Sequence, residues 1–116
     1  MTVKECYEAM GGDYEDVKGR LLTDARVEKY LIKFKDANDI QKVVDSLEEQ
    51  DYESAFRHVH NIKGLSLNLG LSKLRNSSDV LCEELRGGKP EGDISSLLDD
   101  MKKDFDATIA AINQLG

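Results

Sequence analysis

Apolar residues recur every three or four positions along the chain, the spacing that places side chains on one face of an α-helix. The first such group comprises Val3, Cys6, Tyr7 and Met10. Thr2 and Glu5 form a capping-box pattern at its start, and Gly11-Gly12 can end it. Asp13 is suited to begin a second, short helix as its N-cap residue. The pattern therefore predicts two short helices in the N-terminal region.

Three further apolar stripes follow, the first two separated by a break near Asp36–Asn38. The stripe before the break follows Thr23 and comprises Val27, Tyr30, Leu31 and Phe34. The stripe after it comprises Ile40, Val43, Val44 and Leu47. A helix that starts at Asp51 and ends at Gly70 would have an inner stripe of Ala55, Val59, Ile62, Ser66 and Leu69.

The C-terminal part of the chain predicts two more helices. Ser72 is suited to cap the first, which ends at Gly87-Gly88 and has a stripe of Leu74, Ser78, Leu81 and Leu85. The segment GGKPEGD is the strongest loop signal. The last stripe comprises Ile94, Leu98, Met101, Phe105, Thr108, Ile112 and Leu115. No segment alternates as a strand would, so the pattern predicts an all-α, up-down bundle of three or four long helices.

Length and charge exclude some classes of function but do not identify one. At 116 residues we expect one domain spanning 1–116, and the net charge of −7 argues against a nucleic-acid partner. No apolar run is long enough for a membrane span, and the start MTVKECYEAM lacks a secretory core. We therefore expect a cytoplasmic protein with no membrane partner. In that compartment Cys6 and Cys82 are expected to be free, buried thiols.

Both histidines of the chain lie in the stretch FRHVHNIKGLSLNLGL. Successive residues of a helix are about 100° apart, so His58 and His60 point to different flanks and cannot easily share a metal ion. No HExxH or CxxC motif is present, and we predict no metal site. His60, Lys63, Gly64 and Leu67 share one stripe beside the core face.

Three residues of this stripe have an ordinary structural explanation: His60 and Lys63 would be solvated, and Gly64 would permit a close helix crossing. The combination suggests chemistry, because glycine inside a helix costs about 1 kcal/mol relative to alanine. An ordinary imidazole, with a pKa of about 6.5, is largely neutral at cytosolic pH and is a good nucleophile. It could accept a phosphoryl group, with Lys63 offering positive charge and Gly64 clearing the approach of a partner.

The residues HNIKGLSLNLG, His60 to Gly70, resemble the signature of the histidine phosphotransfer (HPt) family, roughly H-x-[LI]-K-G-x-[SA]-x-x-[LFV]-G. The segments DYESAFRHVH, LCEELRGG and YEAMGGDYEDVKGRL also resemble that family's layout, so nearly the whole chain is covered. The resemblance implies an up-down four-helix bundle with short additional N-terminal helices. It also implies a phosphorelay intermediate that takes a phosphoryl group from a receiver-domain aspartyl phosphate and passes it to another receiver.

Carried over by position, the resemblance makes His60 the phosphoacceptor, Lys63 the neighbouring cation and Gly64 the small residue beside the histidine. It places Asn61, Leu67 and Asn68 where they could contact the receiver. Arg86 could reach the phosphoryl site or simply stabilise a helix C-terminus. His58 has no implied role and is expected at the surface.

The implied partners are response-regulator receiver domains and a hybrid sensor histidine kinase. The chain would be a phosphoryl carrier and not an enzyme, with no cofactor of its own, because the receiver would supply Mg²⁺. A bundle of this size can bury its own stripes, so we expect a monomer.

Three alternatives stay open at this point. A kinase dimerisation helix usually carries an acidic residue directly after its histidine and a proline a turn later, whereas Asn61 follows His60 and NIKGLSL has no proline. A small hydrolase would need a base and a polarising group around a nucleophile, which neither histidine has nearby in sequence. Composition and periodicity do not exclude a helical adaptor without phosphotransfer chemistry, and only the stripe that contains His60 argues against it.

Overall fold

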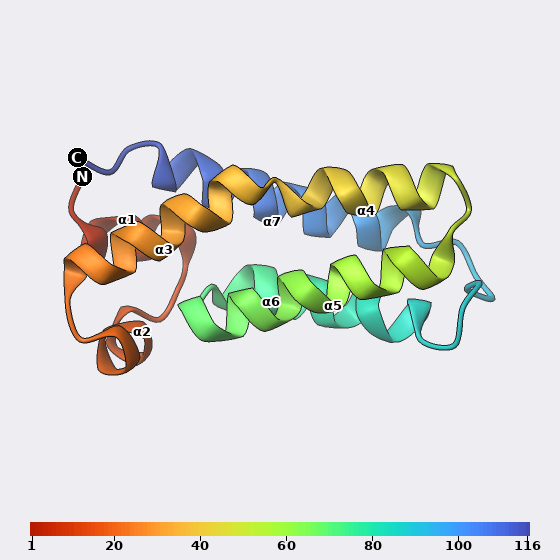
Figure 1. Cartoon of the computed structure of the whole chain (residues 1–116), viewed down its shortest axis with the longest axis horizontal. Helices are drawn as coiled ribbons and strands as arrows, with labels where there is room; N and C mark the ends of the chain where they lie inside the picture. Colours follow the sequence, from red (N-terminus) through yellow and green to blue (C-terminus); the bar gives the residue numbers. More distant parts are fainter.

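Seven α-helices and no strand make up the chain, as a computed structural model of residues 1–116 shows (Figure 1). The helices are α1 (Val3–Met10), α2 (Tyr14–Leu21), α3 (Asp24–Ala37), α4 (Asp39–Glu48), α5 (Tyr52–Leu69), α6 (Ser72–Leu85) and α7 (Ser95–Ile112). The N- and C-termini meet at one end of the molecule, where the Met1 amino group donates a hydrogen bond to the Gly116 carbonyl at 3.3 Å. No helix is long and apolar enough to span a membrane.

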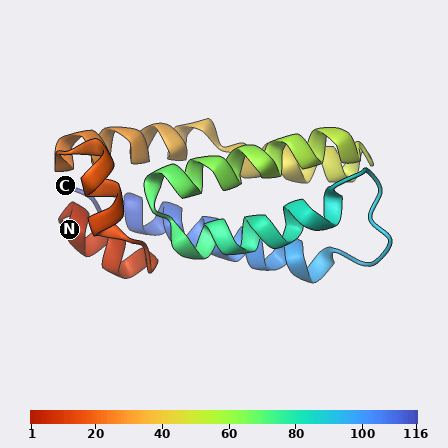
Figure 2. The ribbon, with the colours of Figure 1, turned by 90° about the horizontal axis from the view of Figure 1, so that it is seen from below.

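The bundle has four long helical segments. The helices α3 and α4 follow one another along the same edge and form the first, and α5, α6 and α7 are the other three (Figure 1). The break between α3 and α4 lies at Asn38, whose backbone is left-handed (φ 48°), a conformation that asparagine tolerates well. The short helices α1 and α2 lie across one end of the bundle (Figure 2). The predicted fold, a four-helix bundle with short additional N-terminal helices, is confirmed.

Side chains cap four of the helices, three of them where the sequence predicted it. Thr2 and Glu5 form the predicted capping box, and Asp13, Thr23 and Asp51 each accept a hydrogen bond from a backbone N–H in the first turn of the helix that follows. The prediction for Ser72 is wrong. Leu71, whose side chain is almost fully buried, occupies the N-cap position of α6 instead, and no side chain caps this helix.

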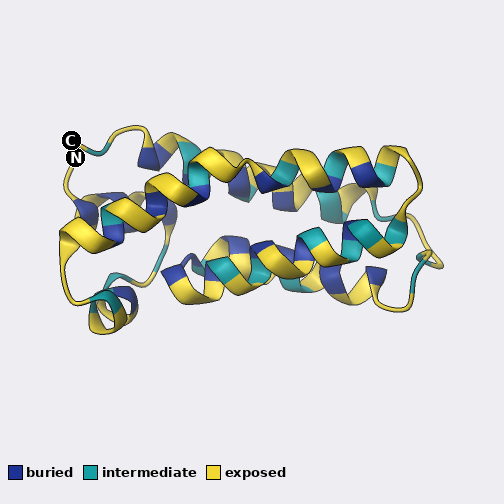
Figure 3. Cartoon of the chain, viewed as in Figure 1, coloured by how far each residue is buried: buried dark blue, intermediate teal, exposed yellow.

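The hydrophobic core follows the predicted stripes, with buried residues on the inner faces of the helices (Figure 3). On α5 the buried set is the predicted one: Ala55, Val59, Ile62, Ser66 and Leu69. Cys6 and Cys82 are both free and buried, as expected. Because this stripe occupies the inner face of α5, the residues between its members are left on the outside.

The N-terminal region holds the C-terminal end of α5. The buried Tyr7 hydroxyl donates a 2.6 Å hydrogen bond to the Leu69 carbonyl, and the Asp13 N–H donates one of 2.8 Å to Gly70. The last carbonyls of a helix lack partners within it, so these contacts satisfy acceptors that would otherwise be unpaired. Gly70 itself has φ +67°, and a Cβ there would lie 2.7 Å from the Asp13 carbonyl oxygen. The first two helices therefore fix where α5 ends.

Candidate functional site

The outer face of α5 carries the predicted site. Asp51 starts the helix by accepting a 3.1 Å hydrogen bond from the Ser54 N–H, and Gly70 ends it in the left-handed conformation. His60 and Gly64, one helical turn apart, are both exposed on the side opposite the buried stripe. Between Ser54 and Gly70 the sequence contains no acidic residue, although the chain as a whole has a net charge of −7. This face therefore differs in charge from the rest of the molecule.

The imidazole of His60 is exposed and has one aromatic neighbour. The ring of Phe56, one turn earlier on α5, lies with its centroid 5.9 Å from that of the imidazole and its plane tilted by 40°. His58 is half-buried, so it is less solvated than expected, and it lies on another flank of the helix. No group of three or more His, Cys, Asp or Glu side chains is arranged to hold a metal ion.

Lys63 is half-buried and engaged across the interface between α5 and α6. Its Nζ lies 2.7 Å from Oδ1 of Asp79. The hydrogen bond from Lys63 lowers the pKa of the Asp79 carboxyl, and the same bond raises the pKa of Lys63. Both groups therefore stay charged at neutral pH. The cation predicted to meet a phosphoryl group has an acidic partner in this structure, which the sequence reasoning did not identify.

Gly64 has open space where a side chain would be. A Cβ built on its backbone would meet no heavy atom within 4 Å. No helix of this chain needs the glycine for a close crossing, so the structural explanation considered from the sequence is wrong. Glycine is unfavourable in a helix interior by about 1 kcal/mol relative to alanine. Packing within the fold therefore does not require a glycine at this position.

The four further predicted residues lie in different surroundings. Leu67 is 51% exposed, on the same face as His60. The side-chain amide of Asn61 donates a 3.2 Å hydrogen bond to the buried Asp39 carboxylate at the start of α4. The exposed Asn68 contributes its backbone carbonyl, which accepts hydrogen bonds of 2.6 and 3.2 Å from Arg20. Asn61 and Asn68 thus have contacts within the chain that sequence spacing does not reveal.

Arg86 and His60 both lie against the ring of Phe56. The guanidinium carbon of Arg86 is 5.3 Å from the centroid of Phe56, the ring that also contacts His60. The guanidinium also pairs with Glu83, at 2.8 Å from Oε1. The C-terminal end of α6 therefore brings a cation to the ring that also contacts the histidine, and whether Arg86 reaches the phosphoryl site stays a prediction. The sequence analysis did not predict that Phe56 contacts both His60 and Arg86. Its position four residues before His60 was the available signal.

Together these features define a helical bundle that presents an exposed histidine on the outer face of α5, with Lys63 about one turn further along the same helix. A comparison with protein-family models matches residues 34–114 to the Hpt domain. The chain belongs to this family, whose members are histidine-containing phosphotransfer modules of two-component signalling. The match includes the whole of α5 and begins within α3, so the assignment of residues 1–33 to the same domain stays a prediction. Comparisons with curated proteins and with solved structures gave no significant match.

Proposed function

We propose that His60 is the phosphoacceptor of a phosphorelay. The observation that carries this proposal is an exposed imidazole at the middle of an outward-facing helix surface, beside a glycine that no neighbour in the chain requires. The signature His60–Gly70 lies inside the region that matches the Hpt domain. An exposed nucleophile suits transfer between two proteins, because the partner can bring the activated phosphoryl group to it.

In the proposed reaction a ring nitrogen of His60 attacks the phosphorus of an aspartyl phosphate on a receiver domain. A nitrogen–phosphorus bond forms as the bond from phosphorus to the aspartyl oxygen breaks, and the aspartate leaves as a carboxylate. The imidazole then loses the proton of its other nitrogen to solvent. Transfer to the aspartate of a second receiver reverses these steps. Mg²⁺ would be held by the receiver, which would also supply the leaving group.

The surrounding residues have distinct proposed roles. Lys63 would exchange Asp79 for the phosphoryl oxygens, since both are anionic partners for its ammonium. Gly64 would leave room for the receiver, and Leu67 would supply apolar contact area. Asn61, Asn68 and Arg86 would border the contact. We further propose that the protein acts as a cytoplasmic monomer, with a hybrid kinase and response-regulator receivers as its partners.

The test is to incubate the wild-type protein, His60→Gln and His58→Gln with a panel of receiver domains carrying labelled phosphate. We expect acid-labile label on the wild type and on His58→Gln, and none on His60→Gln. Label retained on His60→Gln, or lost only in His58→Gln, overturns the assignment. Receiver binding that is unaffected by His60→Gln and never leads to labelling of the wild type would instead identify a helical adaptor.

A further inference from the structure

Asp39 is the only charged residue among the buried residues of the chain, with 4% of its surface exposed. It is the first residue of α4 and directly follows Asn38, whose left-handed backbone separates α3 from α4. Its Oδ1 lies 3.0 Å from Nζ of Lys42, and its Oδ2 accepts the 3.2 Å hydrogen bond from Nδ2 of Asn61. Each oxygen of the buried carboxylate therefore has one partner, and one of these partners is the residue that follows His60 on α5.

The negative charge of Asp39 is costly for the fold. Removing a carboxylate from water is unfavourable unless its partners compensate, and the side chain of Lys42 is itself 54% exposed. The start of α4 offsets part of this cost, because a negative charge is favoured in the first turn of a helix. A neutral asparagine or serine could also form a hydrogen bond with Asn61. The need for a hydrogen bond alone therefore does not explain the charge.

A carboxylate differs from these neutral groups because it can only accept hydrogen bonds. The amide of Asn61 has a donor nitrogen and an acceptor oxygen, and a flip of the amide exchanges the two. Only the orientation with Nδ2 toward Asp39 is compatible with the carboxylate. The amide oxygen Oδ1 is then left without a hydrogen bond inside the chain. Since Asn61 is exposed, this oxygen is available to another molecule.

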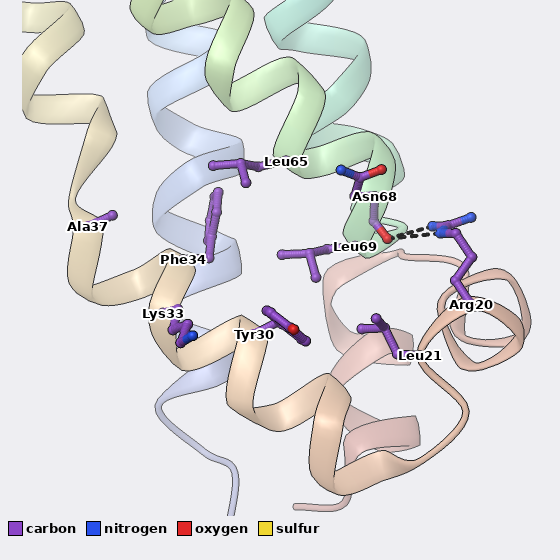
Figure 4. A pocket seen from close by; sticks show the side chains of 9 residues that line it. All are labelled: Arg20, Leu21, Tyr30, Lys33, Phe34, Ala37, Leu65, Asn68 and Leu69. Atoms are coloured by element: carbon purple, nitrogen blue, oxygen red, sulfur yellow. Dashed lines mark hydrogen bonds between the residues drawn. The ribbon is translucent and has the colours of Figure 1, made fainter.

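Asn68, the other asparagine proposed to border the receiver contact, is not held in this way. Arg20 donates its hydrogen bonds to the backbone carbonyl of Asn68, as the dashed lines in Figure 4 show. These bonds leave the exposed side-chain amide of Asn68 free to adopt either orientation. Of the two asparagines, only Asn61 has an amide whose orientation is fixed by the fold.

We propose that Asp39 is a positioning residue of the phosphotransfer site, because it holds the amide of Asn61 with Oδ1 free as an acceptor. The inference rests on the proposed function, in which Asn61 borders the receiver contact. A receiver that presents a hydrogen-bond donor opposite Asn61 gains a hydrogen bond on docking. A receiver that presents a carboxylate there leaves two acceptors unpaired. The pair of Asp39 and Asn61 therefore selects between receivers, and it acts on their binding and not on the chemistry of His60.

The first test needs no receiver. Side-chain amide signals of the ¹⁵N-labelled full chain report hydrogen exchange at each asparagine in NMR spectra. The hydrogen that Asn61 donates to Asp39 should exchange more slowly than either hydrogen of the Asn68 amide, because only the Asn61 amide is bonded within the chain. Asp39→Ala should raise the exchange rate at Asn61 to that at Asn68. Equal rates at the two asparagines of the wild type overturn the proposal.

The second test measures phosphotransfer from a panel of phosphorylated receivers, each at varied concentration. Asn61→Ala should raise KM about 2- to 10-fold for receivers that use the acceptor, which is the effect of losing one hydrogen bond. The effect should fall on KM and not on kcat. Asp39→Asn keeps the size of the side chain but can donate as well as accept. About half of the Asn61 amides should then flip, which raises KM about twofold. Combined with Asn61→Ala, Asp39→Asn should cause no further rise.

Asp45→Asn is the matched control, because Asp45 is an exposed carboxylate of α4 that accepts a 2.9 Å hydrogen bond from the amide of Gln41. It should leave KM unchanged for every receiver. An equal rise in KM from Asp39→Asn with and without Asn61 would assign Asp39 a general structural role and overturn the proposal. Wild-type KM in Asn61→Ala, for every receiver that labels the wild type, overturns this inference and leaves the proposed function intact. Absence of label on the wild type from every receiver overturns both.

Discussion

The ring of Phe56 lies 5.9 Å from the imidazole of His60, measured between centroids. The guanidinium carbon of Arg86 lies 5.3 Å from the centroid of the same Phe56 ring. An exposed histidine on a helix can otherwise populate several rotamers. A tilted aromatic neighbour one turn earlier favours one of them, and such aromatic pairs contribute about 0.5–1.5 kcal/mol. We therefore expect Phe56 to position the imidazole of the proposed phosphoacceptor.

Phe56→Ala is expected to slow phosphotransfer to His60 about 2- to 10-fold. This is the rate ratio that corresponds to losing the energy of the aromatic pair between Phe56 and His60. The effect should fall on kcat and not on KM, because Phe56 aligns the imidazole and does not bind the receiver. Rapid-quench assays with a phosphorylated receiver measure both quantities. Phe56→Leu keeps most of the apolar volume and Phe56→Tyr keeps the ring. Rescue by tyrosine but not by leucine supports positioning, and equal rates for all three variants contradict it.

Gly64→Ala should make the protein more stable and the proposed transfer slower. The new Cβ meets nothing within 4 Å, and alanine is favoured over glycine in a helix interior by about 1 kcal/mol. Urea denaturation measures the gain in the free energy of unfolding. Gly64→Glu should slow transfer further, because the side chain adds bulk and negative charge, while circular dichroism shows unchanged helix content. Transfer at the wild-type rate in both variants would show that the receiver does not approach at Gly64.

Asp79→Asn should favour the phosphorylated state of His60. In the wild type the ammonium of Lys63 is held 2.7 Å from Asp79, and the variant frees it for the phosphoryl oxygens. We expect the equilibrium fraction of phosphohistidine to rise about 2- to 5-fold, the effect of a partly exposed ion pair. Quantifying labelled protein at equilibrium with a receiver measures this fraction. Glu84→Gln removes one charge from an exposed position on the same helix and should have no effect.

The same ion pair gives a defined pH dependence. The Asp79 pKa is lowered by the hydrogen bond from Lys63, so the stabilisation is complete above the unfolded value of about 3.9. It is lost as the pH falls through the lowered pKa of the folded state. From pH 6 to 8 the Asp79→Asn effect on phosphorylation should therefore be constant. An effect that titrates within that window would assign it to another group.

The periodic pattern was sufficient to predict α5 in detail. Its buried residues occur every three or four positions, Asp51 caps its start and Gly70 ends it, all local properties of the sequence. His60 and Gly64 could be placed on the outer face by the same reasoning. Local patterns also located the break near Asn38, because a short polar residue there ends one stripe before another begins.

Contacts between helices could not be predicted in this way. The bond between Lys63 and Asp79 joins residues on two helices, and its formation depends on how α5 and α6 are rotated against each other. The bond between Asn61 and Asp39 depends in the same way on how α4 lies against α5, which no residue spacing specifies. The start of α6 was also predicted wrongly: the buried Leu71 occupies the N-cap position, although Ser72 has the better capping chemistry.

Tyr7→Phe should destabilise the protein by about 1–2 kcal/mol. The Tyr7 hydroxyl is buried and donates a 2.6 Å hydrogen bond to the Leu69 carbonyl, and its loss leaves a buried acceptor without a partner. Burial raises the pKa of Tyr7 above its usual range, so the donor keeps its proton well into alkaline pH. Urea denaturation measures the loss of stability, and hydrogen exchange should show faster opening at Gly70 and Leu71.

Tyr14→Phe is the matched control, because its hydroxyl forms an exposed hydrogen bond to Asp24 at 2.6 Å. We expect this variant to lose less than about 0.5 kcal/mol, as exposed polar contacts contribute little. Both variants should accept phosphate on His60 at the wild-type rate, since His60 lies more than two turns before Leu69 on α5. Equal stability of the two variants would show that the contact between Tyr7 and α5 does not hold the end of this helix. Slower transfer in Tyr7→Phe alone would show that the N-terminal helices reach the histidine through α5.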